Sequence, residues 1–135
     1  MRILIPLLIA ASVAGCTAQP PASLVDVRGQ ARLAEMLRGK VAGEPQKCIP
    51  QRLSSYFDII DPTTIAVRDG SRIYVNHVQG ACSGLHMGNH ALVVKTFGFG
   101  GPCRGDTARV TDLSSGNVMG SCLLGDFVPY NPIRG

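Results

Sequence analysis

The chain has 135 residues, of which 13 are basic and 9 acidic, giving a net charge of +4 when the histidines are neutral. This length provides material for one domain. Tryptophan is absent and aromatic residues make up only 5% of the chain, which argues against a platform on which nucleic-acid bases would stack.

The N-terminus has the layout of a secretory signal peptide. Met1 and the basic Arg2 precede an apolar run over residues 3–14, in the order in which a signal peptide carries its charged and apolar segments. The run is too short to cross a bilayer, which needs about 20 apolar residues, and Pro6 disfavours an ordinary buried helix. An apolar core strand is the alternative, but the position directly behind an N-terminal basic residue favours a leader.

The residues that end this leader are small and are followed by a cysteine. The sequence Val13-Ala14-Gly15-Cys16 resembles the lipobox of bacterial lipoproteins. The resemblance implies that residues 1–15 are removed and that membrane lipid is a partner of the mature chain through acylated Cys16. Thr17 stands where lipoproteins kept in the inner membrane typically carry Asp, so the resemblance also implies the periplasmic face of the outer membrane. Cys16 would then account for the odd count of five cysteines.

A tether and one helix are expected next. Residues 17–23 are small and proline-rich, which predicts a flexible tether over residues 16–29, including the lipidated cysteine. Leu33, Met36 and Leu37 then recur at helical spacing, which predicts a short amphipathic helix over residues 30–45 that docks on the domain. The basic excess over residues 28–52 indicates a solvated face, with contact to anionic lipid headgroups as the alternative.

Short strands follow over residues 46–135. Asp69-Gly70 separates two runs of alternating apolar residues, which is a strong signal for a β-hairpin. Pro129 and Pro132 are expected to end further pairing, so that the C-terminal residues form a tail over an open end of the fold. The pattern predicts a mainly β fold, a small antiparallel barrel or sandwich of about six strands. Besides the two strands of the hairpin, the expected strands span residues 53–60, 91–97, 107–113 and 117–124.

Four further cysteines lie in this β region. In an exported domain of this size they are expected to form two disulfides, because the compartment is oxidising and the core is limited. Four cysteines allow three connectivities, which sequence alone does not distinguish. We favour Cys48–Cys122, which would tie the two ends of the domain, and Cys82–Cys103, which would join loops that flank a strand. The absence of any CxxC pair argues against a zinc site built from these cysteines.

One stretch carries all three histidines. His77, His86 and His90, together with Met87, offer imidazole and thioether ligands that suit copper or zinc. Gly88 and Asn89 argue against a helix that would align the rings, and no carboxylate lies nearby in sequence to orient them. The favoured interpretation is therefore an exposed loop with no metal, and a periplasmic copper or zinc site is the alternative.

No catalytic constellation is recognisable. Ser83 is not in a G-x-S-x-G elbow, and a cysteine nucleophile would need a thiol that the expected disulfides consume. The glycine-rich stretch at residues 98–106 lacks the Lys-Ser/Thr of a phosphate-binding loop and is expected only to turn beside a bridged cysteine. The sequence thus favours a non-enzymatic protein without a cofactor.

The surroundings of the cysteines resemble a family of small exported proteobacterial proteins of unknown function. The resemblance covers roughly residues 30 to 130 and implies that the four cysteines and their flanking glycines form a shared framework. It implies no activity, and His86, Met87 and His90 are not part of it. Together with the lipobox it favours an envelope binding or structural module, with an envelope protein as a possible partner. The segments that carry it are Cys48-Ile49-Pro50, IYVNHVQGACSGL, Cys103-Arg104-Gly105-Asp106 and GSCLLGDFVPY.

Overall fold

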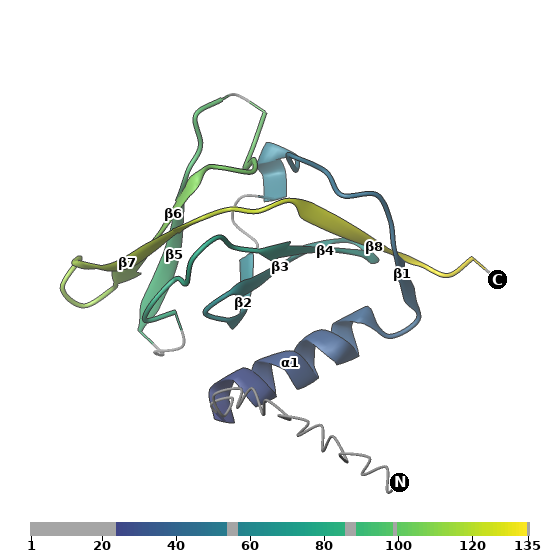
Figure 1. The fold of residues 1–135 in the computed structure, drawn as a ribbon, viewed down its shortest axis with the longest axis horizontal. Coiled ribbons are helices and arrows are strands. Elements are labelled where there is room, and N and C mark those ends of the chain that lie inside the picture. Colours follow the sequence, from purple (N-terminus) through teal and green to yellow (C-terminus); the bar gives the residue numbers. More distant parts are fainter. Residues whose placement is uncertain (1–23, 54–56, 86–88, 99, 135) are drawn as a thin grey trace, which may run out of the picture.

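In the residues that the structure describes, the protein folds as one helix and eight strands arranged in two antiparallel sheets. A computed structural model describes residues 24–53, 57–85, 89–98 and 100–134. In this part of the chain the sheets form a sandwich rather than a closed barrel (Figure 1), which confirms the predicted mainly β class. The elements are α1 (Leu24–Leu37), β1 (Lys40–Ala42), a 3₁₀ turn (Gln51–Leu53), β2 (Phe57–Asp61), β3 (Thr64–Asp69), β4 (Arg72–His77), β5 (His90–Lys95), β6 (Thr107–Asp112), β7 (Val118–Leu123) and β8 (Phe127–Pro132).

The two sheets and the helix make three layers. The larger sheet has the order β1-β8-β4-β3-β2, and the smaller has the order β5-β6-β7. In β3, Ile65 and Val67 face the smaller sheet while Ala66 between them faces α1, so both sides of the strand are buried. Side chains of a strand alternate between its two faces, and here each face has an apolar layer to meet. Consecutive apolar residues in β3 and β4 are therefore both buried, each in a different apolar layer.

The hairpin predicted at Asp69-Gly70 is confirmed. β3 and β4 pair antiparallel, with Asp69 directly opposite Arg72. The four other predicted strands are also present as β2, β5, β6 and β7. The main shift is in β2, which begins at Phe57 rather than at residue 53, because Leu53 belongs to the 3₁₀ turn and is buried there.

The predicted helix over residues 30–45 is wrong at both ends. α1 begins at Leu24 and ends at Leu37, so it takes up part of the stretch predicted as a tether over residues 16–29. Residues 17–23 of that tether lie outside the described residues. Leu33 and Met36 are buried against the larger sheet, as the docking prediction required. Gly29 lies against β2 so closely that a Cβ atom there would overlap the Ile60 carbonyl oxygen.

Two strands were missed, and they pair with one another. Val41, predicted as helical, lies in β1 opposite Asn131 of β8. The C-terminal tail predicted to stop pairing at its prolines is instead β8, which lies between β1 and β4. Pro129 is tolerated because its carbonyl accepts from the Gly43 amide at 2.7 Å just beyond β1, where the ladder has ended. The Pro129 nitrogen, which carries no proton, faces the same side as this carbonyl. Its missing N–H therefore removes no hydrogen bond from the ladder between β8 and β4.

The disulfides form, but with different partners from those predicted. Cys48 pairs with Cys103 and Cys82 pairs with Cys122, whereas the sequence led us to favour Cys48–Cys122 and Cys82–Cys103. Cys48 and Cys103 lie opposite each other in an isolated antiparallel bridge. The Cys82–Cys122 bond ties the segment after β4 to β7, and so links the two sheets.

A buried carboxylate joins α1 to the turn between β2 and β3. Asp61 is 6% exposed and accepts hydrogen bonds from the Thr63 amide and hydroxyl, both at 2.8 Å, and from the Gln30 side chain. Burial alone would raise the pKa of Asp61, but the hydrogen bonds from Thr63 and Gln30 outweigh it and lower the pKa below its ordinary value.

This lowered pKa predicts an acid-sensitive contribution to stability. The contribution is fully present above the pKa of an unfolded Asp, about 3.9, and is lost as the pH falls through the lower pKa of the folded state. We expect Asp61→Asn to lower the free energy of unfolding by about 1–2 kcal/mol near neutral pH. The difference from the wild type should shrink below about pH 4. Urea unfolding at a series of pH values measures this, and a difference that does not change with pH would contradict it.

Candidate functional site

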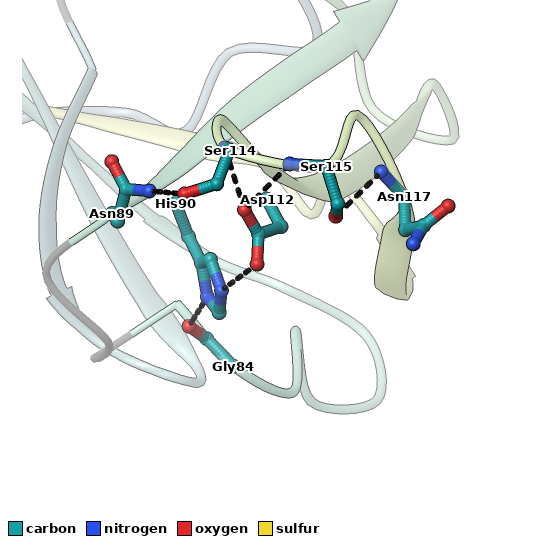
Figure 2. A network of polar contacts seen from close by, with 7 residues as sticks. All are labelled: Gly84, Asn89, His90, Asp112, Ser114, Ser115 and Asn117. Atoms are coloured by element: carbon teal, nitrogen blue, oxygen red, sulfur yellow. Dashed lines mark hydrogen bonds and ion pairs between the residues drawn. The ribbon is translucent and has the colours of Figure 1, made fainter.

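The histidine-bearing stretch places one ring opposite a carboxylate. His90 is the first residue of β5 and Asp112 is the last residue of β6, and the two are direct partners in the antiparallel ladder. The Nε2 atom of His90 lies 3.7 Å from an Asp112 carboxylate oxygen, Oδ2 (Figure 2). The His90 side chain is 5% exposed and that of Asp112 is 27% exposed, so the pair lies at the border of the core.

The other ring nitrogen of His90 is already occupied. Nδ1 lies 2.6 Å from the backbone carbonyl oxygen of Gly84. Because a carbonyl oxygen only accepts hydrogen bonds, Nδ1 must carry the proton of this bond. In a neutral imidazole the second nitrogen is then an acceptor. Nε2 is therefore the ring nitrogen that faces Asp112.

Asp112 is held in place by the turn that follows it. Its Oδ1 atom accepts from the amides of Ser114 at 2.7 Å and Ser115 at 3.2 Å, as Figure 2 shows. These backbone hydrogen bonds lower the pKa of Asp112 below its ordinary value. The Asn89 side chain also donates to the Ser114 hydroxyl, which ties the start of β5 to the same turn. Oδ1 is thus engaged, and Oδ2 faces the ring.

The structure places the two described histidines of the predicted ligand set against different partners. His77 ends β4, where its ring lies 3.4 Å from the Thr64 hydroxyl, whereas His90 faces Asp112. His86 and Met87 lie outside the described residues. Within the described ranges, no three His, Cys, Asp or Glu side chains gather closely enough to hold a metal ion together.

Asp112 does not stand out as a partner of His90 from sequence alone, because it lies 22 positions after that histidine. Its bonds to the amides of Ser114 and Ser115 make it a turn residue. The signal that could have found it is the register of the β5–β6 hairpin, which sets the two residues opposite each other.

The glycine-rich loop before β6 has a structural role. Gly101 has a φ of 106° and approaches the backbone at Ile49 so closely that a Cβ atom would overlap the Ile49 carbonyl oxygen. Cys103 follows in its disulfide, and its amide donates to the Asp106 carboxylate at 2.8 Å. These contacts confirm the predicted turn beside a bridged cysteine.

No family model, curated protein or solved structure matches this chain. The resemblance of its leader and its cysteine surroundings to exported proteins stays a prediction.

Proposed function

We propose that the protein is a lipoprotein anchored by acylated Cys16 on the periplasmic face of the outer membrane, where its β domain acts as a non-enzymatic binding or structural module. The observation that carries the proposal is the use of the cysteines. All four cysteines of the described domain pair with one another. Of the five in the chain, the one left over is the cysteine that ends the lipobox-like sequence.

Two further features support an extracytoplasmic location. Disulfides persist in oxidising compartments, which include the bacterial periplasm. The core is divided into two small apolar clusters, one between the sheets and one beneath α1, and a domain of this size gains from cross-links. None of the helical segments in the described ranges has the length and apolarity that a bilayer crossing needs.

Several polar residues of the described domain have structural partners. Arg52 pairs with Asp69 and Arg104 pairs with Asp126 on the surface. Asn76, fully buried, bonds both the amide and the carbonyl of Gly125. These contacts support a rigid scaffold that presents its surface to an envelope partner.

The anchor is tested by replacing its cysteine. We expect the full chain, expressed in a bacterium fed with a labelled fatty acid, to incorporate the label and to fractionate with the outer membrane. Cys16→Ser should lose the label completely and should not be processed after residue 15, because serine lacks the thiol that receives the diacylglycerol. Intact mass spectrometry of protein extracted in mild detergent measures both changes.

Two outcomes would contradict the proposal. Label retained in Cys16→Ser would show that the lipid is attached to another residue. A Cys82→Ala/Cys122→Ala variant serves as the control, because it loses two other cysteines yet keeps the lipobox and should still be labelled. An unlabelled wild-type chain beside a labelled reference lipoprotein would reject the anchor.

A further inference from the structure

We propose that Nε2 of His90 and Oδ2 of Asp112 form a binding site for a divalent first-row transition metal, with Zn²⁺ as its probe. The inference is independent of the lipid anchor. It begins with a mismatch between the two facing atoms. Nδ1 of His90 donates to Gly84, so Nε2 is the nitrogen that faces Asp112; whenever the ring is neutral, Nε2 is an acceptor opposite a carboxylate oxygen that is also an acceptor.

Two acceptors in a largely buried position repel one another unless a positive charge lies between them. Their separation of 3.7 Å is longer than an ordinary hydrogen bond. Zinc bonds to imidazole nitrogen and carboxylate oxygen are each about 2.1 Å long. A tetrahedral ion therefore needs these two atoms about 3.4 Å apart. The observed distance admits the ion after a movement of only a few tenths of an ångström.

Both ligands are oriented in the manner of metal ligands. A metal-bound histidine generally donates its other ring N–H to a carbonyl or carboxylate, and a bound carboxylate is itself hydrogen-bonded. His90 donates to the Gly84 carbonyl, and Asp112 is held by the amides of Ser114 and Ser115. Each side chain thus keeps one atom fixed and leaves the other for the ion.

The carbonyl that fixes the ring is itself fixed by covalent structure. Gly84 lies two residues after Cys82, which is bonded to Cys122 of β7. The Ser83 segment also lies against Gly120 of the same strand. The ligands come from β5 and β6, so the site is built on two paired strands and one cross-linked segment. Such a site is preorganised, and the remaining coordination positions would be filled by water because Asp112 is partly exposed.

The test is a calorimetric titration of the purified full chain with Zn²⁺ at neutral pH. We expect saturable binding of one ion. His90→Gln and Asp112→Asn should each weaken Zn²⁺ binding by more than about 10-fold. Removing an outer-shell partner of a metal ligand already weakens binding by about 10-fold or more, and these variants remove the ligands themselves. Asp112→Asn keeps an oxygen at the Oδ1 position for the turn amides, so the turn remains while the charged ligand is lost. Thermal unfolding of both variants verifies that they are folded.

His77→Gln is the matched control, because it removes an imidazole from β4 without touching the site. Its affinity for Zn²⁺ should equal that of the wild type. Three results would overturn the proposal. They are the absence of saturable binding, a folded Asp112→Asn variant with wild-type affinity, and loss of binding in His86→Gln while Asp112→Asn still binds. The first result would leave a proton as the only cation between the two side chains.

Discussion

Replacing Cys82 and Cys122 together by alanine is expected to lower the free energy of unfolding by about 2–4 kcal/mol. The bond closes a loop of 40 residues, and its loss returns conformational freedom to the unfolded chain. Both side chains are buried, Cys82 completely, so alanine also removes apolar contacts between the sheets. Urea unfolding under non-reducing conditions measures the change.

The pairing itself is tested by counting thiols. Cys82→Ala/Cys122→Ala leaves the Cys48–Cys103 bond intact and should expose no more thiol than the wild type. Cys82→Ala/Cys103→Ala, which removes the pair that the sequence favoured, should instead leave Cys48 and Cys122 without partners. That variant should therefore react with two additional equivalents of a thiol reagent when unfolded. The reverse pattern would restore the connectivity predicted from the sequence.

Gly29→Ala is expected to destabilise the protein by about 1–3 kcal/mol. In an exposed helix the same change would stabilise by about 1 kcal/mol, because alanine has the higher helix propensity. The sign reverses here because a Cβ atom would overlap the backbone carbonyl of Ile60, and backbone does not yield as a flexible side chain does. α1 would have to move away from β2, opening the cluster around Leu33 and Met36.

Ala31→Gly provides the matched control, two residues along the same helix on its exposed side. It should cost about 1 kcal/mol by propensity alone. Glycine to alanine is therefore expected to destabilise on the buried face of α1, and alanine to glycine on its exposed face. Denaturant unfolding of both variants checks this, and a stabilised Gly29→Ala variant would show that the helix does not lie on β2 as described.

The elements that the sequence predicted correctly are those whose signals lie close together along the chain. The hairpin at Asp69-Gly70 has its turn signal and its alternation within a few residues, and its register follows from them. Class and disulfide formation followed from spacing and composition. The ends of α1 did not, because Val41 continues the spacing of Leu33 and Leu37 as a further helical turn would. Gly39, with a φ of 70°, ends the helix there and sends the chain into β1.

The remaining errors concern partners that are distant in sequence. β8 contains two prolines, and only its position beside the short β1 makes them acceptable. The cysteine pairing depends on which loops meet when the two sheets stack, which no local pattern encodes. Asp112 likewise meets His90 through the strand register. Asn76 is buried and bonds Gly125, which is 49 residues further along the chain.

The position of β8 bears on the order in which the protein can fold. β8 comes last in sequence among the described strands, yet it lies inside the larger sheet between β1 and β4. Phe127, its first residue, has the largest side chain that is completely buried. Without β8, the β2–β3–β4 meander keeps an open edge and the core between the sheets lacks Phe127. The larger sheet is therefore completed only when β8 has joined strands from the beginning and the middle of the described chain. A chain truncated before residue 127 would keep most of its sequence but lose the strand that joins its beginning to its middle.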